Sequence, residues 1–150
     1  MLDAYDGLVT TADESLSLLL GRTAKALSRA FDDVLVAAGG STPTWQVLLA
    51  LQSREHTTLG ELADAVGVRQ PTLTHHLDTL VRAGLVVREA AEGNRRVQRV
   101  TVTESGDHLF RRLRRAAASF DGRLRAGLDD GDVAQLRGLL TQLTENAQPD

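Results

Sequence analysis

The sequence predicts a mainly α-helical protein with one small β-hairpin, in which a winged helix-turn-helix lies between N- and C-terminal dimerisation helices. Three observations predict this fold class. Two short helical patterns follow one another across a tight turn in residues 57–84, and two strand-like runs surround a basic turn in residues 85–103. On both sides of this region, apolar residues recur at helical spacing over long stretches. With 150 residues, the chain has the size of one domain and can bury a core.

A long helix is expected within residues 11–39. Thr11 and Glu14 have the spacing of a capping box, in which two side chains satisfy free backbone N–H groups at a helix start. The pattern ends near Gly39-Gly40, and Thr42-Pro43 starts a second helix. The apolar positions are Leu16, Leu19, Leu20, Leu27, Phe31, Val34 and Leu35 in the first helix and Trp45, Val47, Leu48 and Leu51 in the second.

The two helices that follow have the form of a helix-turn-helix. Thr58 and Glu61 form a second candidate capping box, and Gly67 ends the first of these helices by accepting a left-handed conformation. Pro71 suits the start of the next helix, which Gly84 closes. Its apolar face consists of Leu73, Leu77, Leu80 and Val81. The opposite face is polar, and such a helix has the width to enter the major groove of DNA.

A β-hairpin is expected directly after this second helix. The run from Leu85 to Val87 and the alternating run from Val97 to Val102 read as strands, with Gly93-Asn94 as the turn formers. Arg95 and Arg96 are then carried on the shoulder of the hairpin, where arginine suits a narrow, negative minor groove. A solvated turn is the alternative interpretation of this arginine pair.

The last third of the chain predicts two helices. Thr103 caps a long one, and Asp129 or Asp130 begins the last one. A run of four arginines lies just past the start of the long helix, and its default interpretation is a solvated face that makes salt bridges: Arg111, Arg112, Arg114 and Arg115. The terminal helices carry more apolar surface than a small winged helix needs, so we expect them to pair two copies of the chain about a two-fold axis. Residues 1–10 are either a loose tail or a segment that crosses to the partner.

The order and spacing of these motifs resemble the MarR/SlyA family of dimeric winged-helix transcription regulators. The matching segments are Gln70-Pro71-Thr72-Leu73, Leu80 through Val86, Asn94-Arg95-Arg96 and Val102-Thr103-Glu104-Ser105-Gly106. The family wing usually reads Asp-x-Arg, whereas Asn94 stands here in place of the aspartate. His75 occupies a position where the family often has arginine.

The resemblance implies one MarR-like domain over residues 1–150, with the DNA-binding region in residues 41–103 and dimerisation helices in residues 11–39 and 104–146. It also implies a ligand-responsive regulator, with repression the expected sense, that binds double-stranded DNA as a homodimer. Family members commonly bind small aromatic or phenolic acids in a cleft between the two parts. Candidates for its lining are Phe31, Trp45, Leu48 and Leu49, for which plain core packing is the alternative.

The DNA-contacting residues follow from the helix start and the wing. Glutamine can pair with adenine, threonine offers a hydroxyl or methyl contact, and histidine can donate to a base acceptor. The family counterparts of Arg69 suggest a contact with the backbone or with a base. The full predicted set is Arg69, Gln70, Thr72, Thr74, His75, Asn94, Arg95 and Arg96.

The charge distribution agrees with this interpretation, although the net charge is −3. Residues 69–103 hold six arginines against three acidic residues, so positive charge gathers on the proposed helix and wing. No apolar run reaches the length of a membrane span and no signal pattern opens the chain, so a cytoplasmic protein is expected.

Three other classes of function remain as alternatives of lower rank. A metal-responsive regulator would have to use His56, His75, His76 and His108, because the chain has no cysteine and no metal-ligand spacing. An enzyme is not expected, since there is no nucleophile elbow, phosphate-binding glycine loop or metalloprotease motif, and no cofactor is expected. A winged helix used only for protein contacts is the third, and the basic wing argues against it.

Overall fold

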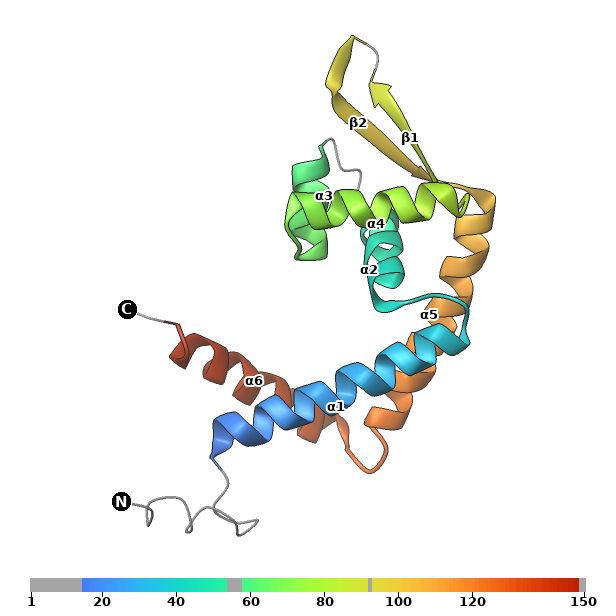
Figure 1. The fold of residues 1–150 in the computed structure, drawn as a ribbon. Helices are drawn as coiled ribbons and strands as arrows, with labels where there is room; N and C mark the ends of the chain where they lie inside the picture. Colours follow the sequence, from blue (N-terminus) through green and yellow to red (C-terminus); the bar gives the residue numbers. More distant parts are fainter. Residues whose placement is uncertain (1–14, 54–57, 92, 149–150) are drawn as a thin grey trace, which may run out of the picture.

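The computed structural model describes residues 15–53, 58–91 and 93–148, and it confirms the mainly helical winged-helix fold (Figure 1). In the described residues, four helices precede a single hairpin and two helices follow it. The elements are α1 (Leu16–Ala37), α2 (Thr42–Ser53), α3 (Leu59–Val66), α4 (Gln70–Arg82), β1 (Val86–Ala91), β2 (Asn94–Val102), α5 (Glu104–Leu124) and α6 (Asp130–Asn146).

The molecule has two ends joined by the long helix α5. At one end, α2, α3 and α4 pack together, with the hairpin projecting beyond them (Figure 1). At the other end lie α1, α6 and the C-terminal half of α5, and α1 packs along α5. The winged helix-turn-helix is therefore held at the tip of an extended frame.

Local side-chain chemistry sets several helix ends. The Thr58 hydroxyl accepts from the Glu61 N–H at 3.1 Å, and the Glu61 carboxylate accepts from the Thr58 N–H at 3.1 Å, which confirms the predicted capping box. Gly67 ends α3 with a φ of 77°, a left-handed conformation that suits glycine. Asp129 and Asp132 form a further capping box at the start of α6. The capping box expected from Thr11 lies outside the described residues.

One hydrophobic core connects the winged helix to α1 and α5. Its fully buried side chains come from α1 to α5 and β1: Leu35, Val47, Leu48, Leu62, Leu73, Leu77, Leu113 and Val86. Trp45 of α2 stacks on Phe110 of α5, with ring centroids 5.5 Å apart. Burial of each such leucine contributes about 1.5–3 kcal/mol, so this core holds α5 firmly against the winged helix.

The start of α5 is joined to the start of the hairpin by hydrogen bonds around Thr103. Its hydroxyl donates to the Gly84 carbonyl at 2.6 Å and accepts from the Gly106 N–H at 3.1 Å. Its own N–H donates to the Leu85 carbonyl at 3.0 Å. A side chain on Gly106 would collide with that same carbonyl oxygen. The Thr-x-x-Gly spacing in residues 103–106 is thus required by a close approach of two backbones.

The terminal helices leave much apolar surface uncovered. Nothing on α6 is buried, and α1 buries only Leu35 among its described residues. The exposed large hydrophobics on these helices, at the end of α5 and in the connection that follows it include Leu16, Leu18, Leu19, Leu27, Leu124, Leu128, Leu136, Leu139 and Leu140. Among the described residues, no single helix is long and apolar enough to cross a membrane, and α1 and α2 reach that length and composition only as a pair bent by 78°.

Candidate nucleic-acid interface

Helix α4 is fixed in place by one apolar face. Leu73 and Leu77 are fully buried and Leu80 is nearly so. These positions are separated by three or four residues, so they lie on one side of the helix. Several positions on the rest of its circumference are exposed and carry polar groups.

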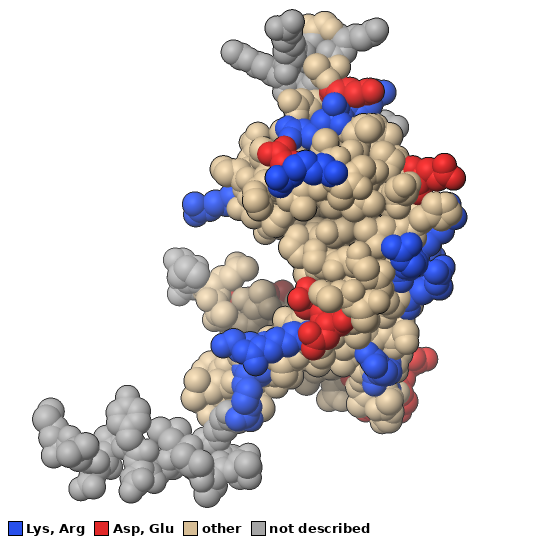
Figure 2. All heavy atoms as spheres, turned by 45° about the vertical axis from the view of Figure 1, so that its right-hand side comes forward, with Lys and Arg blue, Asp and Glu red and all other residues tan. Residues whose placement is uncertain are grey.

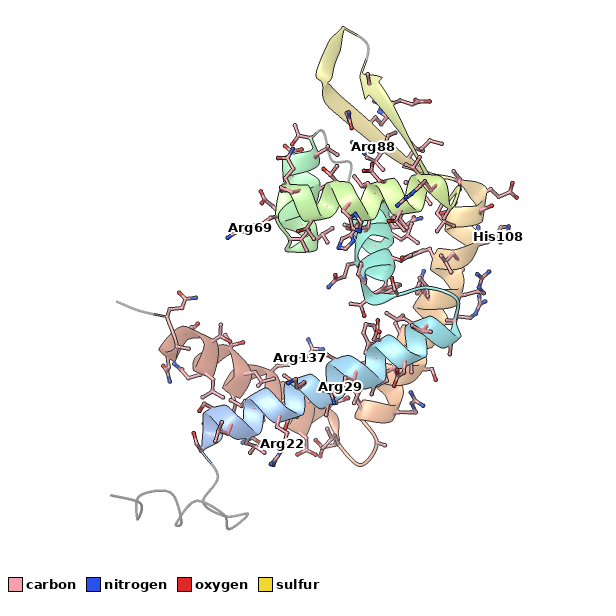
Figure 3. The ribbon with its side chains drawn as sticks, in the orientation of Figure 1. Arg22, Arg29, Arg69, Arg88, His108 and Arg137 are labelled. Carbon is pink, nitrogen blue, oxygen red and sulfur yellow. The ribbon has the colours of Figure 1, made fainter. Side chains whose placement is uncertain are left out.

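The predicted DNA-contacting residues of α4 lie on or beside this free face. Gln70, Thr72 and His75 are exposed, whereas Thr74 is half-buried. Arg69 has extended backbone at the position before the helix and makes no side-chain capping bond. Figure 3 shows Arg69 pointing away from the body of the molecule. The structure therefore brings these side chains together at the N-terminal end of α4, where a groove-binding helix contacts base edges.

The wing is an antiparallel hairpin whose register runs from the pair Val86–Val102 at its base to the pair Ala91–Asn94 near its tip. Gly93 makes the turn with a φ of 80°. The three predicted wing residues occupy the first positions of β2, which places their backbone next to the tip: Asn94, Arg95 and Arg96. Their side chains lie outside the described part of the structure.

Arg88 was counted with the basic residues of this region, but the structure shows that it is engaged within the protein. Its Nη1 lies 2.8 Å from the Asp78 carboxylate on α4. Its Nε donates to the Gln98 side-chain oxygen on β2 at 3.0 Å, and its Nη2 donates to the same oxygen. Sequence reasoning missed this arrangement. The register of the hairpin could have predicted the contact with Gln98. Arg88 pairs with Val100, and Gln98 lies two residues from Val100 on the same face of the ribbon.

The arginine run on α5 is also arranged differently from the prediction. Arg112 donates to the Ala38 carbonyl at 3.3 Å and so caps the end of α1. The other three border an open depression of about 260 Å³ together with Ala118, and none is paired with a carboxylate of the described residues: Arg111, Arg114 and Arg115. Figure 2 shows basic side chains gathered on this side of the molecule, below the hairpin. The face is solvated as predicted, and the expected salt bridges are not found among the residues that the structure describes.

The four candidates for lining an effector cleft lie in different environments. Leu48 is fully buried in the core, whereas Leu49 is exposed on the other side of α2. Trp45 and Phe31 are half-buried and contact different rings of α5, Phe110 and Phe120 respectively. Trp45 and Phe31 retain exposed surface beside α5, and Leu48 retains none.

The histidines give little support to a metal site. The rings of His75 and His76 are 6.1 Å apart and tilted, and His108 lies 3.7 Å from Glu104 on the surface. Among the described residues, no three potential metal ligands come together, and His56 lies outside them.

Comparison with known proteins identifies the family of this fold. A profile of the MarR family matches residues 39–97, the stretch that contains α2, α3, α4 and most of the wing. The solved transcriptional regulator PA3341 is 31% identical to this chain, with a TM-score of 0.70, over 88% of this chain and 97% of PA3341. The chain belongs to the MarR family. It is a DNA-binding transcription regulator with a winged helix, and regulators of this family are not enzymes.

Structures of MarR-like proteins with bound DNA share this fold. The transcriptional regulator MosR of M. tuberculosis, solved in complex with DNA, is 25% identical with a TM-score of 0.69, over 91% of this chain and all of MosR. The transcriptional repressor CouR, bound to a 23-mer DNA duplex, is 23% identical with a TM-score of 0.78, over 87% and 92% of the two chains. CouR from Rhodococcus jostii RHA1 has also been solved with p-coumaroyl-CoA.

Proposed function

We propose that this MarR-family protein is a homodimeric repressor that binds a pseudo-palindromic operator and responds to a small aromatic or phenolic acid. The observation that carries the proposal is the free polar face of α4 beside a projecting wing, on a frame whose terminal helices leave their apolar faces uncovered. In this proposal residues 41–103 bind DNA, and residues 11–39 and 104–146 form the dimer. A regulator of this kind acts on DNA in the cytoplasm.

The proposed dimer rests on the apolar surface of the terminal helices. Leu136, Leu139 and Leu140 recur at helical spacing on α6, and each is at least 43% exposed. Most of the stability of a helix in a protein comes from packing of its apolar face, so α6, on which no described residue is buried, needs a surface to cover it. Pairing with a second copy would bury these leucines together with those on α1 and the end of α5. It would also place two recognition helices about one DNA turn apart.

The proposed reading of DNA divides the contacts between two grooves. Gln70, Thr72, Thr74 and His75 contact base edges in the major groove, and Arg69 contacts the backbone or a base at the helix start. The wing residues Asn94, Arg95 and Arg96 follow the neighbouring minor groove.

Replacing Arg96 with alanine tests the wing contact. We expect operator affinity to fall about ten- to hundredfold, because loss of a specific arginine contact costs about 1–3 kcal/mol. The dimer should keep its melting temperature. Fluorescence anisotropy with labelled operator duplex measures the change.

Arg115→Ala is the matched control for Arg96→Ala. It removes an exposed arginine from α5, away from the wing and α4, and should leave operator affinity unchanged. Wild-type affinity in the Arg96 variant would refute the wing contact. Equal losses of affinity in both variants would show that the effect of Arg96→Ala is a nonspecific effect of charge.

The proposed effector site lies beside α2, where Trp45 retains exposed surface. Trp45 is the only tryptophan of the chain, so its fluorescence reports on this region alone. Titration with phenolic acids and with p-coumaroyl-CoA should change the Trp45 emission and release the labelled duplex at the same concentrations. Release of the duplex without a change in emission would show that the effector binds away from Trp45. If no compound changed the emission or released the duplex, the proposed effector class would be contradicted.

A further inference from the structure

The Arg88 side chain connects three elements that take part in the proposed contact with DNA. It extends from β1, contacts Asp78 on α4, and donates twice to Gln98 on β2. Figure 3 shows Arg88 between the hairpin and α4. The Arg88 side chain is only 20% exposed, and the negative charge of Asp78 faces it directly. A guanidinium that is paired and largely covered in this way is a poor candidate for a phosphate contact.

The hairpin needs such a connection because a two-stranded ribbon alone is marginally stable and free to swing. Its base is held by buried Val86 and by the hydrogen bonds of Thr103, but its outer half projects beyond the helices (Figure 1). Gly93 lies five residues beyond Arg88, which is about 16 Å at about 3.3 Å per residue. A tilt of about 10° at Arg88 would therefore displace the tip by about 3 Å, as much as the length of a hydrogen bond.

We propose that Arg88, with Asp78 and Gln98, is a positioning residue that fixes the angle between the wing and the recognition helix and does not itself contact DNA. The inference rests on the proposed binding of α4 and the wing to one duplex. Asp78 lies one turn after His75, so the connection joins the wing to the same segment of α4 that reads bases. Both groove contacts can then form together without a further ordering step, which favours binding.

Arg88→Met tests this inference because methionine preserves much of the side-chain length but forms neither the ion pair nor the hydrogen bonds. We expect operator affinity to fall about tenfold, since part of the wing contact is lost. The dependence of log affinity on log salt concentration should keep its wild-type slope. A lost phosphate contact would instead reduce that slope by about 0.9 for each protomer.

Two further variants separate positioning from direct contact. Arg88→Lys keeps the charge and can pair with Asp78, but it lacks the planar fork that also reaches Gln98, so we expect an affinity between those of Arg88→Met and the wild type at an unchanged salt slope, whereas lysine would restore a lost phosphate contact. Asp78→Asn should weaken binding in the wild-type background and have little additional effect in the Arg88→Met background, because both act through one connection. Thermal melting of each dimer shows that the fold is retained, and Arg88→Lys replaces Arg88→Met if the latter does not fold.

The possible results distinguish this inference from the proposed function. Weaker binding at unchanged slope, with non-additive Asp78 and Arg88 effects, is the expected result. Wild-type binding by folded Arg88 variants, or a reduced slope restored by lysine, would overturn the inference and leave the proposed function standing. A wild-type protein that binds no duplex would overturn the proposed function and this inference with it.

Discussion

Replacing Gly106 with alanine is expected to destabilise the fold by about 3 kcal/mol, the upper part of the range for an overpacked site. The added Cβ would meet the Leu85 carbonyl oxygen and, at 2.7 Å, the Cγ1 atom of Val102. The carbonyl cannot move away without losing the hydrogen bond that it accepts from the Thr103 N–H. Urea denaturation followed by circular dichroism measures the loss.

Gly122→Ala, on the same helix, is the control for this substitution. A Cβ at position 122 meets nothing within 4 Å. Alanine there should stabilise the protein by about 0.5–1 kcal/mol, because it lowers the conformational entropy of the unfolded chain and favours helix. If Gly106→Ala behaved like Gly122→Ala, the two backbones would not meet as closely as described.

Introducing glutamate at both Leu136 and Leu140 is expected to convert the proposed dimer into monomers. Each leucine that leaves an apolar interface costs about 1.5–3 kcal/mol, and the two-fold axis doubles the loss to four leucines. A monomer engages only one half-site, so we expect operator affinity to fall more than about a hundredfold. Sedimentation equilibrium gives the mass, and anisotropy gives the affinity.

Gln135→Glu provides the control for the dimer prediction, since it adds a negative charge to an exposed position of α6 without removing apolar surface. It should remain a dimer. An unchanged mass for the double leucine variant would show that these leucines are not in the interface between two copies.

Much of the fold could be predicted because its signals are local. The Thr58–Glu61 capping box, Gly67 at the end of α3 and Pro71 in the first turn of α4 each act within four residues. The apolar run from Leu85 to Val87 and the alternating run from Val97 to Val102, on either side of Gly93, similarly predicted the hairpin. Such signals involve residues that are close together in the sequence, so the sequence alone is sufficient to recognise them.

The parts that the sequence did not reveal depend on contacts between distant residues. Arg88 reaches Asp78 and Gln98 only because the hairpin folds back over α4, and its charge alone suggested DNA. The arginine run on α5 shows the same limit. Helical spacing separates Arg112 from Arg111 and Arg114, but only the packing of α1 on α5 makes Arg112 a cap for Ala38.

The wing and the effector region could be predicted only in part. The backbone of Arg95 and Arg96 lies next to the tip, as the turn chemistry predicted, whereas Asn94, expected in the turn, is the first residue of β2 and pairs with Ala91. The four effector candidates were chosen by residue type, and tertiary packing then separated them, with Leu48 in the core and Leu49 at the surface. Residue type predicts burial on average, whereas the direction of each side chain depends on which face of α2 meets α5.

Selection of binding sites from random duplex DNA tests the central claim most directly, because it requires α4, the wing and the dimer to act together. The account predicts enrichment of two inverted half-sites whose centres lie about 10 base pairs apart, bound by one dimer and weakened by salt. Failure to enrich any duplex at low salt, or enrichment of a single asymmetric site bound by one protomer, would contradict it.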